Sequence, residues 1–184
     1  MPRLLLAALA LLPLAGHALD LTPTRGSRDL EGFRIPVVRF TDGAEKVAYQ
    51  PPAGWILNGG GDLLSLYPTD RPDVLMQFHV TVLEPLAANV VEDFDAWCRR
   101  FLPPDATQTA LDAETVSAFT LRGRPSREST YRYVAQGRRL LTTVAVVDVS
   151  SRERLSVVIT ARSADFKAAR EEAIRSLFSM NWGE

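Results

Sequence analysis

Strand-forming runs joined by very short turn sequences fill the second half of the chain. Four such runs, rich in β-branched and aromatic residues, cover 116–121, 129–135, 139–149 and 155–161. The joints between them are Arg122-Gly123-Arg124-Pro125, Gln136-Gly137 and Ser150-Ser151-Arg152-Glu153. A parallel neighbour needs a crossover of about a dozen residues or more, so joints of this length predict antiparallel pairing.

Two amphipathic helices are predicted, one before these runs and one after them. Asn89 and Glu92 have the spacing of a capping box, and apolar residues follow at helical spacing until Pro103-Pro104 ends the helix. A second helix is expected to begin at Ser163. Shorter strands are predicted at 35–40, 46–50, 63–67 and 74–83. The order of strands, helix, strands and helix predicts an α+β fold, in which helices flank an antiparallel β-sheet in an α/β/α sandwich.

Three consecutive glycines, at 59–61, raise the question of a phosphate-binding loop. Such a loop presents backbone N–H groups at the start of a helix, with a lysine and a serine or threonine at fixed spacing. Here Asn58 precedes the glycines, and the strand-like run 63–67 follows them without a lysine or a helix cap. Asparagine and glycine tolerate the positive φ of tight hairpin turns, so a β-hairpin is predicted.

The first 18 residues have the features of a secretory signal peptide. A positive start at Arg3 precedes an apolar run of 11 residues, from Leu4 to Leu14, and a small-x-small site ends at Ala18. A membrane-spanning helix needs about 20 apolar residues, so cleavage near Ala18 and export to the periplasm or the medium are expected. The polar segment 19–34 is predicted to be a flexible leader, and 35–184 a single domain.

Two short motifs resemble those of the PsbP-like fold. The first is Tyr49-Gln50-Pro51-Pro52-Ala53-Gly54-Trp55, a strand that ends in a Gly-Trp turn, and the second is the closing segment Phe178-Ser179-Met180-Asn181-Trp182. Together with the order of elements, the resemblance covers most of 38–182. It implies a sandwich of the PsbP-like type, as in an extrinsic photosystem II subunit, a nuclear Ran-binding protein and many exported bacterial proteins. The group shares no catalytic site, so the resemblance implies no catalytic residues.

Charge is distributed unevenly along the chain. Residues 19–121 hold 8 basic and 15 acidic residues, a balance of −7, whereas 122–162 hold 9 arginines and 3 acids, a balance of +6. Many of these arginines lie at strand ends and hairpin joints. The sequence therefore predicts a docking surface for an anionic partner, such as an acidic envelope protein. The residues predicted to form it are Arg122, Arg124, Arg154 and Arg162.

Residue types that commonly act in catalysis or metal binding are few after the signal peptide. His79 is the only histidine there and lies in a predicted strand without a local nucleophile motif, while Cys98 lies on the apolar stripe of the first helix. Glu92, Asp93 and Asp95 form the densest acidic cluster, without calcium-loop spacing. We therefore expect no cofactor, no metal, no nucleic-acid partner and no transmembrane segment in the mature chain.

A non-catalytic binding or assembly module for an anionic partner is the function that these features favour. Two other classes stay open. A small-ligand carrier requires a pocket between helix and sheet. A hydrolase requires His79 within hydrogen-bond reach of a nucleophile and a carboxylate.

The predicted signal peptide generates the first testable prediction. Mass spectrometry of the intact protein from the periplasm or the medium should give a mature N-terminus near Leu19. Retention of the full chain in the membrane fraction would contradict signal-peptide cleavage.

Overall fold

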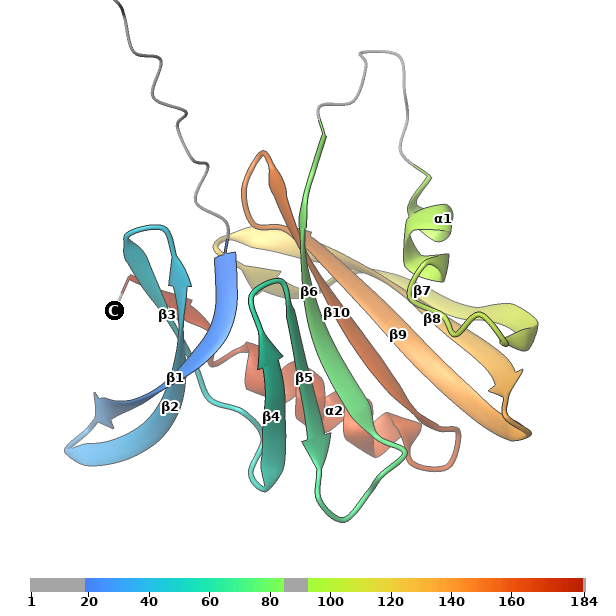
Figure 1. Ribbon diagram of the computed structural model, residues 1–184, viewed down its shortest axis with the longest axis horizontal. Helices are drawn as coiled ribbons and strands as arrows, with labels where there is room; N and C mark the ends of the chain where they lie inside the picture. The colour runs from blue at the N-terminus through green and yellow to red at the C-terminus, as the bar shows by residue number, and fades with distance from the viewer. Residues whose placement is uncertain (1–18, 85–92, 184) are drawn as a thin grey trace, which may run out of the picture.

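The computed structural model describes residues 19–84 and 93–183 (Figure 1). Within these ranges, the first half of the chain forms strands β1 (Leu19–Leu30), β2 (Phe33–Asp42), β3 (Glu45–Tyr49), β4 (Trp55–Gly60), β5 (Leu63–Pro68) and β6 (Leu75–Val82). The second half forms helix α1 (Phe94–Arg99), strands β7 (Thr107–Leu121), β8 (Arg124–Ala135), β9 (Arg138–Asp148) and β10 (Glu153–Arg162), helix α2 (Phe166–Leu177) and strand β11 (Asn181–Trp182).

Two antiparallel sheets organise these strands. The larger has seven strands in the order β4-β5-β6-β10-β9-β8-β7, and the smaller has four in the order β1-β2-β3-β11. The hairpins β7–β8, β8–β9 and β9–β10 confirm the antiparallel pairing predicted from the short joints. Between β6 and β10 the chain forms α1 and then β7, β8 and β9, which make up the far part of the same sheet, and β10 returns between β6 and β9.

The glycine-rich segment turns the chain, as predicted. It joins β4 to β5 in an antiparallel hairpin whose register runs from Trp55 opposite Pro68 to Gly60 opposite Leu63. Gly59 has a φ of +113°, and a Cβ atom there would lie 2.5 Å from the Leu63 carbonyl oxygen. Only glycine fits this position without strain.

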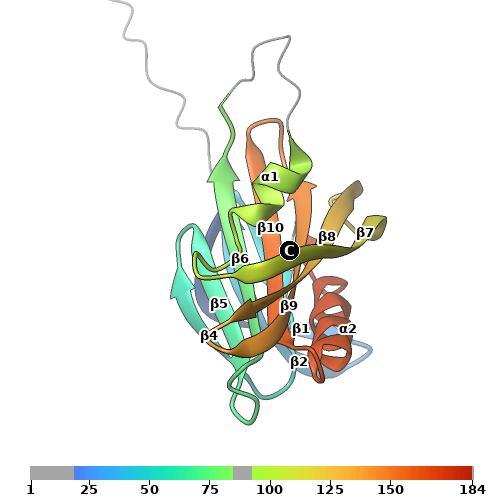
Figure 2. The same cartoon turned by 90° about the vertical axis from the view of Figure 1, so that its right-hand side faces the viewer.

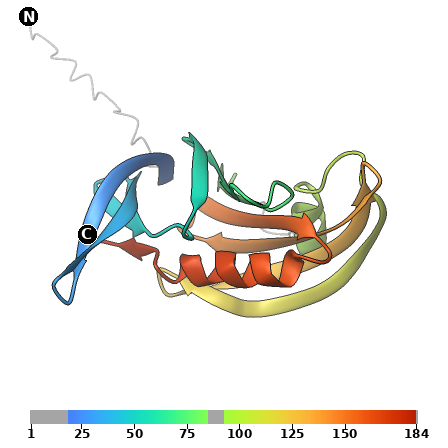
Figure 3. The same cartoon turned by 90° about the horizontal axis from the view of Figure 1, so that it is seen from below.

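The predicted α/β/α sandwich is wrong. Strands make up 62% of the described residues and helices 12%, and the second layer on one face is a β-sheet as well as a helix. Figure 3 shows the larger sheet curving around α2 as a half-barrel, with the smaller sheet beside it. The helix predicted after Asn89 is only six residues long in the described range, too short to form a covering layer. The capping box at Asn89 and Glu92 lies outside the described residues.

The segment predicted to be a flexible leader contains β1 and the start of β2. Pro23 and Gly26 argue against a regular strand, but the register of β1 with β2 shifts between Asp20 and Thr24, so Pro23 does not have to donate to the ladder. The Leu21 N–H instead donates to the carbonyl of Gly61 in the β4–β5 turn, at 2.8 Å. This bond links β1 to the larger sheet.

Side chains alternate along β10 between two hydrophobic clusters on opposite faces of the sheet. Leu155, Val157 and Ile159 join the main core, which also includes apolar residues of α2 and of the smaller sheet. Val158 points to the opposite face and joins the cluster beneath α1. Figures 1 and 2 show α1 near the end of the sheet where β6 stops and β9 turns into β10.

The core position of β1 is testable by truncating one of its side chains. Leu21 is completely buried, so Leu21→Ala should destabilise the protein by about 2–5 kcal/mol, the usual cost of removing a buried leucine side chain. The measurement is the free energy of unfolding in urea. Leu30→Ala is the matched control, because Leu30 lies on the same strand with 51% exposure and should cost little. Equal effects of the two substitutions would contradict the anchoring of β1.

Candidate functional site

Helix α1 presents an aromatic face to the sheet. Asp93 caps the helix, because its side-chain oxygen accepts a hydrogen bond from the Ala96 N–H at 3.1 Å. Phe94, Trp97 and Phe101 then pack against the cluster on β8, β9 and β10. These contacts hold α1 beside the ends of β6 and β9.

Trp97 is the centre of this region. Its indole N–H donates to the Ser156 hydroxyl on β10 at 3.2 Å, which orients the ring relative to the sheet. The guanidinium carbons of Arg100 and Arg154 lie 4.6 and 4.5 Å from the centroid of the ring. Both distances are within the range of attractive cation–π contacts. The indole therefore brings two cations close together.

Arg154 is a largely buried cation held in one orientation. Its Nε donates to Asp148 Oδ1 at 2.7 Å, and its side chain is 8% exposed. Arg124 donates to the backbone carbonyl of the same Asp148 at 3.0 Å. The end of β9 therefore gathers two of the four predicted partner-binding arginines.

A groove of about 770 Å³ opens beside Trp97, and we call it the Trp97 groove. Its walls come from the end of β6, from α1 and from the β9–β10 hairpin. The residues that line it are Thr81, Val82, Leu83, Glu84, Trp97, Arg100, Asp148, Ser151, Arg152 and Arg154. Apolar side chains and three guanidinium groups thus share one surface with the carboxylates of Glu84 and Asp148.

Two of these arginines differ from the others in their ion pairing. Within residues 19–84 and 93–183, neither Arg100 nor Arg152 makes an ion pair with a carboxylate. By contrast, the neighbouring Arg99 bonds to Asp95 at 2.6 Å. Arg100 and Arg152 are therefore the groove cations available to an outside anion. Sequence reasoning counted Arg152 among the nine arginines of 122–162 without selecting it. It missed Arg100, because the sequence cannot show that the end of α1 lies next to the β9–β10 hairpin.

The other two predicted partner-binding arginines lie elsewhere. Arg122 bonds to Asp42 at 2.7 Å and to Glu45 at 3.0 Å, at the junction with the smaller sheet. Arg162 pairs with Asp73 at 2.5 Å. It is eight residues beyond Arg154 on β10, which corresponds to about 26 Å along a strand. The structure therefore does not gather the four residues on one surface, and carboxylates of the first half neutralise two of them.

His79 lies on the α1 face of β6. It is opposite Ser156 in the ladder, and its ring meets the Phe101 ring edge to face with centroids 4.9 Å apart. Burial lowers the pKa of His79, an effect that the negative charge of Asp62 partly opposes. In the described part of the chain, its side chain has no hydrogen bond to a nucleophile or a carboxylate. Among the described residues, the geometry of a nucleophile–base pair is therefore not assembled around His79.

Asp93 and Asp95, the described residues of the acidic cluster, stabilise helix α1 and its contact with the sheet. Asp93 caps α1, whereas Asp95 accepts hydrogen bonds from Arg99 at 2.6 Å and from the Tyr131 hydroxyl at 2.7 Å. Glu92 lies outside the described residues. Across the two described ranges, no three His, Cys, Asp or Glu side chains gather as metal ligands would. Neither described helix has the length and apolar composition needed to cross a membrane.

Comparison with known proteins rests on structure. The sequence matches no protein-family model and no curated protein. The structure is similar to the solution structure of cyanobacterial PsbP (CyanoP) from Synechocystis sp. PCC 6803, with a TM-score of 0.50 over 95% of this chain and 99% of that one. The chain has a PsbP-like fold. Identity between the two sequences is 12%, so the likeness concerns the fold alone.

The two motifs that resemble the PsbP-like fold hold α2 and the smaller sheet in place. The Trp55 indole donates to Glu172 on α2 at 2.9 Å, and Arg71 bonds to the other oxygen of that carboxylate at 2.7 Å. At the C-terminal end, the Trp182 indole donates to Asp42 at 2.9 Å. In this PsbP-like fold, each tryptophan therefore links elements that are far apart in the sequence.

Cys98 should be almost unreactive in the folded protein. Its side chain is fully buried, and burial raises the pKa of the thiol to about 12. Since the thiolate is the nucleophile, only about one thiol in ten thousand is reactive at pH 8. Labelling with iodoacetamide, followed by mass spectrometry, should be slow in buffer and fast in urea, and Cys98→Ser gives the blank. Rapid labelling of the native protein would contradict the packing of α1.

Proposed function

We propose that this protein is an exported, non-catalytic binding module that docks an acidic segment of an envelope protein in the Trp97 groove. Export is inferred from the predicted signal peptide, residues 1–18. The docking site rests on one observation: Arg100 and Arg152 lie in a groove with the apolar side chains of Val82, Leu83 and Trp97, and they make no ion pair within the described residues.

Charge and shape both favour a peptide segment with acidic and apolar residues. Guanidinium groups bind carboxylates through two parallel hydrogen bonds, and an indole offers a flat apolar surface beside them. Arg154 is already bonded to Asp148, so its role is to hold the Trp97 ring in place. The predicted role of Arg154 therefore becomes orientation of the site, while the contacts to the partner pass to Arg100 and Arg152.

A small-ligand carrier is the second candidate, because the Trp97 groove lies between a helix and the sheet. Its volume of about 770 Å³ is within the range of small-molecule sites. An anilinonaphthalene sulfonate dye tests this candidate, since it is aromatic, anionic and small. Dye binding that depends on Arg100 and Arg152, without peptide binding, would support the carrier instead of the docking module.

The docking proposal is tested with a fluorescent peptide in which Glu alternates with Leu and Phe. Fluorescence anisotropy should show binding that weakens as salt rises from ~0.05 to ~0.5 M, because screening reduces the attraction between charges. A peptide with Gln in place of Glu should bind much less. Arg100→Glu with Arg152→Glu should weaken binding by about ten-fold or more, while the midpoint of thermal unfolding stays nearly the same.

Arg139→Glu with Arg175→Glu is the matched control. Both arginines are exposed, lie outside the Trp97 groove and make no ion pair in the described part of the chain. This control changes the net charge by the same amount, so it should reduce binding only slightly. Equal losses in the two double variants, or binding that is insensitive to salt, would contradict docking at the Trp97 groove.

A further inference from the structure

The β1–β2 hairpin carries the most exposed large apolar side chain of residues 19–84 and 93–183. Phe33 is 74% exposed, and Leu30, its partner in the ladder, is 51% exposed. Glu31 and Gly32 form the turn between them, with φ values of +50° and +86°. We call residues 30–33 the hairpin tip. Water is a poor environment for two adjacent side chains of this size, so the tip favours a partner outside the fold.

The hairpin tip continues an apolar row along one face of the hairpin. Side chains alternate along a strand, so Phe33, Ile35 and Val37 of β2 share a face with Leu30, and Arg28 lies opposite Ile35 on it. Phe33 is exposed, Ile35 is half-buried and Val37 is buried. The row therefore begins in the core and ends in solvent at the tip.

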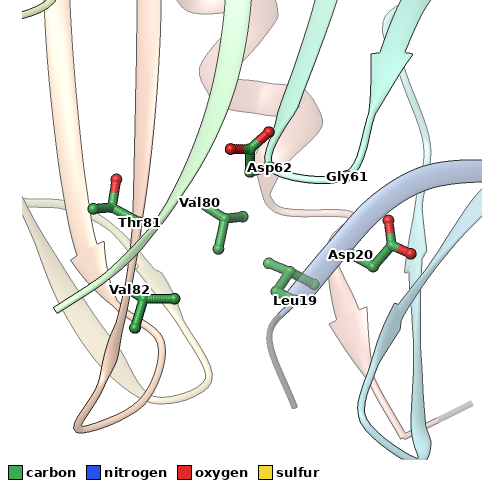
Figure 4. Close-up of a pocket in the computed structure, with 7 residues that line it drawn as sticks. All are labelled: Leu19, Asp20, Gly61, Asp62, Val80, Thr81 and Val82. Atoms are coloured by element: carbon green, nitrogen blue, oxygen red, sulfur yellow. The ribbon is translucent and has the colours of Figure 1, made fainter. Parts of the chain in front are cut away.

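The base of the hairpin is fixed to the larger sheet, whereas the tip projects. The Leu21 N–H donates to the Gly61 carbonyl at 2.8 Å, and the Gly61 N–H donates to the Thr22 hydroxyl at 3.0 Å. Figure 4 shows Leu19, at the start of β1, beside this turn, where both line a pocket of about 490 Å³. Figures 1 and 3 show the hairpin extending beyond the larger sheet, on the side of the molecule away from α1. The fold thus holds the tip away from its own surface.

Positive charge is concentrated on the hairpin. Residues 24–39 have a balance of +2, whereas 19–121 as a whole have a balance of −7. The acids of the hairpin are Asp29 and Glu31, and the cations are Arg25, Arg28, Arg34 and Arg39. Arg34 lies 3.8 Å from Asp29, with side chains that are 78% and 76% exposed. Exposed ion pairs contribute little to stability, so Arg34 can exchange Asp29 for another anion.

An apolar tip flanked by cations matches the surface of an anionic phospholipid bilayer. Lipid phosphates accept hydrogen bonds from guanidinium groups, and the boundary beneath them accepts apolar side chains. A stable protein interface buries about 800 Å² on each partner, far more than two side chains at a turn offer. We propose that the hairpin tip inserts Leu30 and Phe33 into the surface of an anionic phospholipid membrane, while the arginines of the hairpin contact lipid phosphates.

Membrane binding by the hairpin tip goes beyond docking at the Trp97 groove and does not depend on it. Because α1 lies on the other side of the molecule, a protein bound through the tip holds the Trp97 groove away from the membrane (Figure 1). Glu31 opposes this binding, since lipid phosphates repel its carboxylate. Its removal therefore provides a variant that should bind more tightly.

The test uses the expected mature chain, residues 19–184, and vesicles of phosphatidylglycerol and phosphatidylcholine in equal parts. Sedimentation with the vesicles should show binding that falls as salt rises and is nearly absent on phosphatidylcholine alone. Leu30→Ser with Phe33→Ser should weaken binding by about ten-fold or more. The midpoint of thermal unfolding should stay nearly the same, because both side chains are exposed.

Leu111→Ser with Val116→Ser is the matched apolar control. These side chains of β7 are 48% and 66% exposed, so their replacement should change vesicle binding by less than about two-fold. Equal losses in the tip variant and in this control would overturn the proposal.

Charge variants test the contacts to phosphate. Arg25→Gln with Arg34→Gln should weaken binding by about ten-fold or more, and Glu31→Gln should strengthen it by about five-fold, the usual effect of one charge near an anionic membrane. The charge-matched control replaces two exposed arginines that lie outside the hairpin, Arg139→Gln with Arg175→Gln, and should have little effect.

Insertion is measured with Phe33→Trp. Brominated phosphatidylcholine in the vesicles should quench the added fluorescence, whereas a tryptophan placed on β7 by Val116→Trp should not be quenched. Failure to bind the anionic vesicles, or equal binding to phosphatidylcholine alone, would overturn the proposal. Self-association that is lost in Leu30→Ser with Phe33→Ser, without vesicle binding, would assign the tip to a second copy of the chain instead.

Discussion

The β6–β10–β9 ladder is the constraint on which the rest of the structure depends. β10 pairs with a neighbour on both sides, and nearly all its residues are buried on both faces. Because side chains alternate along a strand, this single strand contributes to two separate hydrophobic clusters. The main core needs α2 and the smaller sheet as its cover, and the cluster on the other face needs α1. The position of the Trp97 groove follows, since α1 covers that face only near one end.

Polar contacts at the edges of the sheet then decide what each surface can do. Carboxylates from the first half of the chain reach many of the arginines in the second half, as Asp73 does with Arg162 and Asp42 with Arg122. Charge that is segregated in the sequence is therefore mixed in space. Arg100 and Arg152 are different because the described parts of α1 and of the β9–β10 hairpin bring no carboxylate into pairing distance. The proposed docking surface lies where arginines keep no carboxylate partner among the described residues.

The candidate site was only partly predictable. Arg124 was selected because it flanks a Gly-Pro joint, and Arg154 because strand parity puts it on the polar face of its strand. Both do meet at Asp148. Arg100 was not identified, because a helical arginine beside an apolar stripe resembles an ordinary solvent-exposed residue. Its importance comes from Trp97, and the orientation of Trp97 depends on a hydrogen bond to Ser156, 59 residues away.

The sequence by itself determined the features that depend on a few consecutive residues. These are the antiparallel hairpins, the glycine-rich turn between β4 and β5 and the burial of Cys98, because turn geometry and side-chain alternation are local properties. Only the tertiary structure decided that β1 joins the core, that a second sheet replaces a helical layer, and that Trp97 meets Ser156. Each of these contacts joins segments separated by many residues, and packing of the whole core selects among the many pairings that the local pattern allows. For the same reason, polar residues such as those of β1 resemble a loose leader until the surface that they cover is known.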